Sequence, residues 1–189
     1  MKVAGRTTAI TPFYAMEVLK AANERAAQGN NVLHMEVGEP AGGAPAAVLQ
    51  AAKEALENGQ GLGYTEALGV PALRQAISDH YKTTGNLDVD PGHVVVTTGS
   101  SGGFLLAFLA AFDAGDRVAL ASPGYPAYRN IMAALGIEAV DLASDIGDRF
   151  QPTPALLDAA IEQGGKLAGL LIASPANPTG TMLDHDALK

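Results

Sequence analysis

Three segments with residue types suited to ligand binding follow apolar runs that read as strands. The first, residues 98–103, has the sequence Thr-Gly-Ser-Ser-Gly-Gly and leads directly into a predicted helix. A helix begins with unpaired N–H groups and the positive end of its dipole, so small residues and two hydroxyls at this point fit a phosphate cradle. Neither a Walker loop nor a G-x-G-x-x-G dinucleotide fingerprint is present. A tight strand-to-helix turn would use the same residues, and the segment alone leaves both readings open.

The second and third segments add an aromatic surface and a directed hydrogen bond. Residues 122–128 place Tyr125 and Tyr128 on a loop punctuated by two prolines, where they could stack on a flat ligand or cap the core as an aromatic pair. Residues 174–180 hold Asn177 between two prolines, and its amide could donate one hydrogen bond to a ligand oxygen. A generic Asn-Pro turn is the alternative for this segment.

These segments lie where the pattern of apolar residues predicts the ends of parallel strands. Beyond residue 91, short apolar runs alternate with helical stretches, which is typical of an α/β fold with a largely parallel sheet. Ligands of such sheets bind beyond the carboxyl ends of the strands. Strands are expected at residues 32–37, 93–97, 117–121, 137–142 and 167–173. Helices are expected at residues 14–28, 102–113, 127–135 and 154–163, after Pro45 and after Pro71, with Thr153 as the N-cap of the helix at 154–163.

Composition narrows the class of protein. With 48% hydrophobic and 17% charged residues, the 189-residue chain has enough apolar material for a core. A net charge of −8 disfavours nucleic-acid and membrane partners, and the absence of cysteine excludes disulfides and thiolate chemistry. No metal site is predicted. The first nine residues lack the apolar region of a secretory signal, and the longest apolar run, residues 104–112, is too short to span a bilayer, so a cytoplasmic protein is expected.

Together with two further segments, the three loops resemble the class I/II aminotransferases, a family of enzymes that depend on pyridoxal 5'-phosphate (PLP). Order and spacing agree over residues 37–180, and Tyr125 lies 52 residues before Asn177. Asn177-Pro178-Thr179-Gly180 matches the family's N-P-x-G signature, Ser122 to Tyr128 matches its cofactor-stacking loop, and Gly99-Ser100-Ser101-Gly102 matches its phosphate turn. Val37-Gly38-Glu39-Pro40 is similar to its N-terminal G-E-P segment, and Tyr64 to Arg74 is similar to its Y-x-x-x-x-G-x-x-x-L-R segment.

The resemblance implies an α/β, PLP-dependent transferase-like fold, aminotransferase fold type I. The chain would hold an incomplete large domain with an N-terminal arm from the small domain, divided into residues 1–40 and residues 41–189. The implied activity is amino-group transfer between an amino acid and a 2-oxo acid, with pyridoxal 5'-phosphate as cofactor. Two alternatives stay open: a PLP-dependent lyase or decarboxylase of the same fold, and a non-catalytic regulatory module with an aminotransferase-like domain.

The resemblance also assigns roles to individual residues. Gly99, Ser100 and Ser101 would hold the cofactor phosphate, Tyr125 would stack on the pyridine ring, and Asn177 would bind the 3' oxygen of that ring. Gly38 would meet the carboxylate of the substrate. The family's tyrosine that matches Tyr64 reaches the phosphate of the neighbouring subunit, which implies a homodimer. Tyr128 is expected to have a packing role first.

The family's catalytic residues have no counterpart among these positions. Its Schiff-base lysine, the acid beside the pyridine nitrogen and the carboxylate-binding arginine all come later than N-P-x-G, so no catalytic residue is assigned here. None of the six lysines stands next to a ligand loop, and the 189 residues alone are expected to be inactive. In the family, later strands separate the first strand from the other three, so two pieces of sheet are expected. The lysines are Lys2, Lys20, Lys53, Lys82, Lys166 and Lys189.

Overall fold

The computed structural model describes residues 2–38, 42–59 and 63–189, which form two compact units. One unit combines residues 1–14 with Phe104–Lys189, and the other comprises Ala15–Gly103. Each unit is described by itself. The predicted domain boundary at residue 40 stays a prediction, because the two units are defined only by contacts within these 189 residues. No helix in the described ranges combines the length and the apolar character that crossing a membrane requires.

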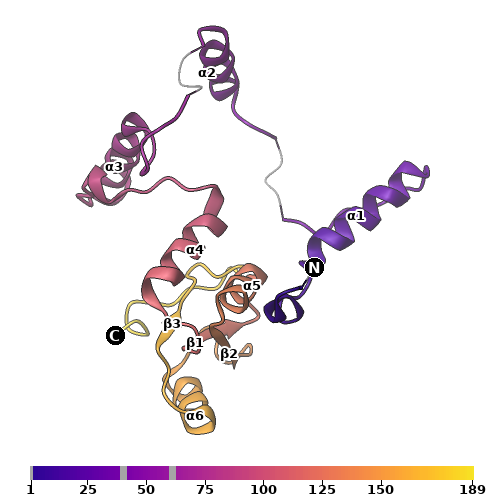
Figure 1. Cartoon of the computed structure of the whole chain (residues 1–189), viewed down its shortest axis with the longest axis vertical. Helices are drawn as coiled ribbons and strands as arrows, with labels where there is room; N and C mark the ends of the chain where they lie inside the picture. The colour runs from indigo at the N-terminus through magenta and orange to yellow at the C-terminus, as the bar shows by residue number, and fades with distance from the viewer. Residues whose placement is uncertain (1, 39–41, 60–62) are drawn as a thin grey trace. The chain divides into compact units, whose positions relative to one another are not determined.

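The unit that contains Phe104–Lys189 is built on a parallel sheet of three strands (Figure 1). The strand order is β2-β1-β3, so β1 lies in the centre and pairs with both neighbours in parallel. The connections through α5 and α6 are the crossovers that parallel strands need. The strands are β1 (Arg117–Ser122), β2 (Glu138–Ala143) and β3 (Gly169–Leu171), and the helices between them are α5 (Pro126–Leu135) and α6 (Pro154–Gly164).

The central strand is buried on both faces, as its continuous apolar sequence predicts. Val118 and Leu120 point to one face, where they pack with Phe108 of α4 (Gly99–Ala111) and Met132 of α5. Ala119 points to the other face and packs with Leu142 and with Ala160 of α6. The sheet therefore has α5 and the later turns of α4 on one face and α6 on the other.

Two of the predicted helices in this part of the chain begin where the local chemistry indicates, and a third begins earlier. Pro126 and Pro154 occupy the first turns of α5 and α6, where the missing N–H costs nothing. Thr153 caps α6 as expected, since its hydroxyl accepts a hydrogen bond from the Leu156 N–H at 3.3 Å. Helix α4 begins at Gly99, three residues before the expected start, so the phosphate-cradle residues form its first turn.

The unit that contains Ala15–Gly103 is helical. Its helices are α1 (Tyr14–Ala27), α2 (Ala46–Glu57), α3 (Pro71–Gly85) and the short η2 (Pro91–His93), and a further short helix, η1 (Gly5–Thr8), precedes α1 in the chain. Helix α3 packs on η2, where Arg74 donates two hydrogen bonds to the Pro91 carbonyl and the Ser78 hydroxyl donates one to the Val89 carbonyl.

Two expected strands are absent from the described chain, and those predictions were wrong. Residues 32–37 have no strand pairing, and residues 93–97 start in η2 and continue as extended backbone. The Val96 N–H donates to the Leu68 carbonyl at 2.9 Å, but Val95 is 48% exposed. Apolar runs predict a strand only where a neighbour supplies hydrogen bonds, and within residues 63–103 no neighbouring strand does so. The described chain accordingly has one piece of sheet, where two were expected.

Candidate functional site

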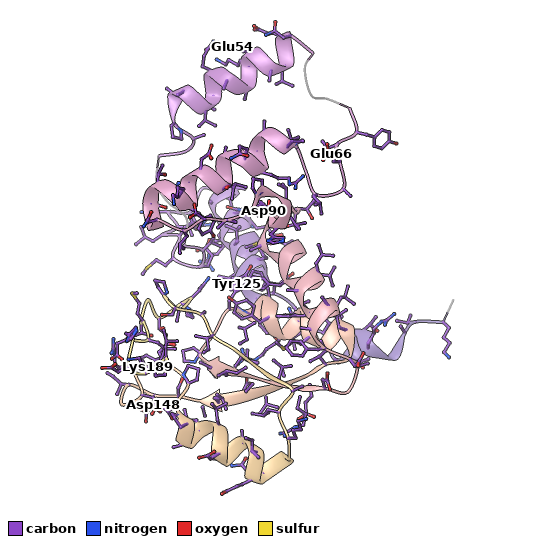
Figure 2. All side chains as sticks on the ribbon, turned by 90° about the vertical axis from the view of Figure 1, so that its left-hand side faces the viewer. Glu54, Glu66, Asp90, Tyr125, Asp148 and Lys189 are labelled. Carbon is purple, nitrogen blue, oxygen red and sulfur yellow. The ribbon has the colours of Figure 1, made fainter. Side chains whose placement is uncertain are left out.

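A tight turn at the carboxyl end of β1 sets the position of Tyr125. A Cβ atom on Gly124 would lie 2.7 Å from the carbonyl oxygen of Ala121, so the turn closes only around a residue without a side chain. Tyr125, which is labelled in Figure 2, follows with extended backbone as the N-cap of α5, and Pro126 begins the helix. The prolines and the glycine of this loop therefore direct Tyr125 to the ligand end of the sheet.

Aromatic contacts hold Tyr125 and Tyr128 in place. The ring of Tyr125 packs edge to face against Phe13 and Tyr128, with centroid distances of 6.1 and 5.4 Å. The ring of Tyr128 packs in the same way against Phe104 of α4, at 4.8 Å. Burial raises the pKa of the Tyr128 phenol, and the neighbouring Tyr125 adds to the shift, so Tyr128 stays neutral in the physiological range. This geometry supports the packing role expected for Tyr128.

The loop that carries Asn177 follows β3, the neighbour of β1, so both loops leave the same edge of the sheet. The loop is closed by its own backbone: the Ala176 N–H donates to the Thr181 carbonyl at 2.9 Å, and the Gly180 N–H donates to the Ala176 carbonyl at 2.8 Å. Gly180 has a φ of 69°, the left-handed conformation that favours glycine. Within residues 63–189 none of the loop's hydrogen bonds uses the Asn177 amide, which is exposed and available to a ligand.

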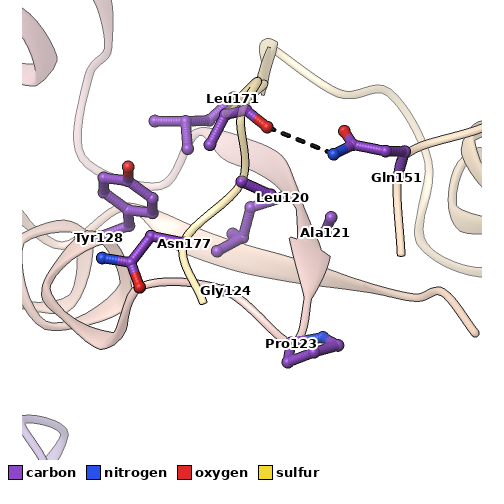
Figure 3. A pocket seen from close by; sticks show the side chains of 10 residues that line it. Leu120, Ala121, Pro123, Gly124, Tyr128, Gln151, Leu171 and Asn177 are labelled. Atoms are coloured by element: carbon purple, nitrogen blue, oxygen red, sulfur yellow. Dashed lines mark hydrogen bonds between the residues drawn. The ribbon is translucent and has the colours of Figure 1, made fainter. Parts of the chain in front are cut away.

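A small pocket lies between the two loops. Leu120 and Leu171 line its inner wall, and Tyr128, Gly124 and Asn177 border it (Figure 3). Its volume of about 20 Å³ has room for roughly one water molecule. A pyridine ring does not fit inside, so a flat ligand would lie over the rim, where Tyr128 and the Asn177 amide both border the pocket. Tyr125 is not among the lining residues, and its ring packs against that of Tyr128. These residues fit the cofactor that the sequence implies.

Sequence reasoning missed the residues that support this rim. Phe13 and Phe104 reach the tyrosines from distant parts of the chain, and Gln151 reaches the Asn177 loop from the segment between β2 and α6. No local signal marks them, because each acts through a contact that only the fold creates. The glycine before Tyr125 is the exception: Pro-Gly in a short loop is a turn signal.

The remaining predicted site residues belong to the other compact unit, and the structure does not relate them to Tyr125 or Asn177. Gly99 has a φ of 75°, and its carbonyl accepts a hydrogen bond from the Thr97 hydroxyl at 2.8 Å. Ser100 and Ser101 follow in the first turn of α4 and are exposed, with their backbone amides at the helix start. This turn therefore has the features of an anion cradle.

Two further predicted positions in this unit are accessible. Gly38 is exposed, and a Cβ there would meet no atom within 4 Å, while the Glu39-Pro40 part of its motif lies outside the described residues. The Tyr64 side chain is fully exposed, at 109% of its reference area. The roles of Gly38 with substrate and of Tyr64 with a partner subunit stay predictions.

Sequence comparison finds known proteins that match this chain over nearly its whole length. The sequence model of the family "Aminotransferase class I and II" matches residues 30–189. A valine–pyruvate aminotransferase of Mycobacterium tuberculosis is 51% identical over 179 residues, which are 95% of this chain and 45% of that protein. An aspartate aminotransferase of Geobacillus stearothermophilus is 31% identical over 189 residues, which are 100% of this chain and 47% of that protein.

Solved structures agree with the sequence matches. The crystal structure of an aminotransferase from Mycobacterium tuberculosis superposes with a TM-score of 0.90 at 50% identity, over 100% of this chain and 47% of that one. The aspartate aminotransferase of Thermus thermophilus with maleate superposes with a TM-score of 0.88 at 29% identity, over 100% of this chain and 48% of that one. The chain thus spans about half the length of these relatives and has their aminotransferase fold type I. It belongs to the class I and II aminotransferase family.

Proposed function

We propose that the protein transfers an amino group between an amino acid and a 2-oxo acid with pyridoxal 5'-phosphate as cofactor. The observation that carries the proposal is the Asn177 amide on a closed loop at the carboxyl edge of a parallel sheet, where it borders one pocket with Tyr128, the ring neighbour of Tyr125. The relatives named above are aminotransferases, and they lend no support to the lyase or the regulatory alternative.

Each predicted residue has a chemical task in this proposal. When bound, the cofactor supplies an electron sink and carries the amino group between the two substrates. Asn177 donates a hydrogen bond to the 3' oxygen of the pyridine ring and favours the ionised form of that oxygen. Tyr125 offers its ring for stacking, and the serines of α4 offer hydroxyls and amides to the phosphate. A pre-organised set of contacts fixes the ring before substrate arrives.

We propose that none of the six lysines forms the covalent link to the cofactor. Lys166 lies between α6 and β3, at the amino end of that strand and so opposite to Asn177. Lys189 pairs with Asp186 at 3.5 Å, and Lys82 pairs with Asp88 at 2.8 Å. The 189 residues alone would then not transaminate. Incubation with cofactor, borohydride reduction and peptide mapping should find no specifically modified lysine, and a single modified lysine with turnover would contradict this.

The substrates and the assembly are further parts of the proposal. The relative at 51% identity is a valine–pyruvate aminotransferase, so valine with pyruvate is the first pair to assay, with aspartate and 2-oxoglutarate as the comparison. A homodimer follows if Tyr64 reaches the phosphate in a partner subunit, and its full exposure supports that role. The cytoplasmic location stays a prediction, drawn from the first nine residues and from the length of the longest apolar run.

The test of the cofactor site is the substitution Asn177→Ala in the complete protein that contains this sequence. Loss of one hydrogen bond to a charged oxygen costs about 1.5–3 kcal/mol, which is roughly a 10- to 100-fold loss of PLP affinity. Absorbance titration of the apoprotein with PLP measures it. Asn23→Ala, at an exposed position of α1, is the matched control and should leave the affinity unchanged. Equal affinity and an equal spectrum for Asn177→Ala would remove Asn177 from the site.

A further inference from the structure

Gln151 is a buried polar residue that no predicted role accounts for. Its side chain is 3% exposed, although glutamine is usually a surface residue. The side-chain Nε2 lies 2.9 Å from the Thr181 carbonyl oxygen, 3.1 Å from the Thr181 hydroxyl and 3.5 Å from the Ala173 carbonyl oxygen. Figure 3 draws the last of these bonds, from the Gln151 amide to the backbone beyond β3. One amide group therefore satisfies acceptors at two places in the chain.

Two left-handed residues precede Gln151 and direct its side chain toward the Asn177 loop. Arg149 and Phe150 have φ values of 55° and 56°, the left-handed conformation that is unfavourable for residues with a Cβ. The turn persists because the Phe150 N–H donates to the Asp145 carbonyl at 2.8 Å and the Gly147 N–H donates to the Asp145 carboxylate at 2.6 Å. Strained backbone of this kind is kept only where its surroundings fix it. The direction of Gln151 is thus built into the segment between β2 and α6.

The two acceptors of Gln151 are the two ends of the Asn177 loop. Ala173 directly precedes residues 174–180, and Thr181 directly follows them. The same Thr181 carbonyl also accepts the Ala176 N–H that closes the loop. Gln151 therefore donates hydrogen bonds to both ends of the loop. Asn177 directly follows Ala176, whose N–H forms the hydrogen bond that closes the loop.

We propose that Gln151 is a positioning residue that fixes the direction of the Asn177 amide at the cofactor rim. This inference rests on the proposed function, since it gives Gln151 a task only if Asn177 binds the cofactor. Gln151 itself lines the small pocket under the rim together with Asn177. Without the Gln151 hydrogen bonds, the loop keeps its internal hydrogen bonds but loses those to the β2–α6 segment. The Asn177 amide can then adopt more than one orientation.

The test replaces the donor and keeps the volume. Gln151→Met in the complete protein removes the N–H groups, and Gln163→Met, at an exposed position of α6, is the matched control. Loss of orientation should weaken PLP binding by about three- to tenfold, less than Asn177→Ala. The pH midpoint of the bound cofactor's visible absorption should rise by up to about one unit, in the same direction as in Asn177→Ala, because the ionised oxygen loses its donor. Hydrogen–deuterium exchange of residues 174–181 should accelerate in the cofactor-free protein.

A double substitution separates positioning from a purely structural role. In the Asn177→Ala background, Gln151→Met should cause no further shift of the absorption midpoint, because its effect acts through Asn177. A fall in thermal stability with wild-type affinity and midpoint would overturn the proposal and leave Gln151 as a structural brace. If Asn177→Ala itself changes neither quantity, the proposed function fails first. Should Gln151→Met not fold, Thr181→Val removes one acceptor and must shift the midpoint in the same direction, and an unchanged midpoint would refute the inference.

Discussion

The substitution Gly124→Ala tests whether the turn after β1 positions Tyr125. The new Cβ would lie 2.7 Å from the Ala121 carbonyl oxygen, while ordinary contacts of a Cβ begin near 3.4 Å, so the two atoms must separate by about 0.7 Å. Ala121 is paired with Leu142 in the sheet and cannot yield easily. The displacement therefore falls on Gly124 and Tyr125, the residues that lead into α5.

The expected cost has a stability part and a binding part. Overpacking of this kind costs about 1–3 kcal/mol, which lowers Tm by roughly 2–12 °C in a protein of this size. A displaced Tyr125 loses part of an aromatic contact worth about 0.5–1.5 kcal/mol, which corresponds to up to roughly tenfold weaker PLP binding. Urea unfolding measures the first quantity, and absorbance titration measures the second.

The matched control is Gly5→Ala. A Cβ there would meet no atom within 4 Å, and the φ of Gly5 is not positive, so stability and binding should stay within about 0.5 kcal/mol of the wild type. Equal unfolding free energies for the two alanine variants would refute the close approach of Gly124 to Ala121. A destabilised Gly124→Ala protein with unchanged PLP affinity would refute the link from this turn to Tyr125.

Two further predictions concern the core and the titration of Tyr128. Met132→Ala should lower the free energy of unfolding by about 2–5 kcal/mol, because Met132 is 0% exposed. The control Met182→Ala should cost far less, because Met182 is 51% exposed. Chemical unfolding of both variants measures the difference. The raised pKa of Tyr128 means that the folded protein holds this proton more tightly than the unfolded chain, so its contribution is complete below the unfolded pKa of about 10 and is lost as pH rises through the folded value. Tyr128→Phe should therefore lose less stability than the wild type as the pH rises above about 10, and parallel Tm curves for the two proteins would contradict the shift.

Much of the fold was predictable because its signals are local. Proline at the start of α3, α5 and α6 and the Thr153 cap act within one helical turn, so the sequence places those helix starts closely. The run at residues 117–121 also became a strand, since its apolar side chains are buried on both faces of the sheet. The run at residues 93–97 looks similar but has no strand beside it in the described chain, which shows that apolar content alone does not make a strand.

The motifs of the candidate site could be predicted from the sequence, but the contacts that hold their side chains in place could not. Asn177 and Tyr125 stand out because prolines and glycines fix their loops. Gln151 does not stand out, because its importance depends on Thr181, which is 30 positions later in the chain. Contacts across such a distance leave no local pattern, so only the structure brings them into view.

The register of the sheet has a consequence for the order in which this unit folds. Residues of β1 pair with residues 21 positions later in β2 but with residues 51 positions later in β3. Closing the shorter loop costs less chain entropy, so we expect β1, α5 and β2 to form the nucleus and β3 to dock afterwards. The Asn177 loop follows β3, and Gln151 can hold it only after docking. Mutations that slow this last step would therefore give a chain with a formed core that cannot yet orient Asn177, so competence for ligand would lag behind the recovery of secondary structure during refolding.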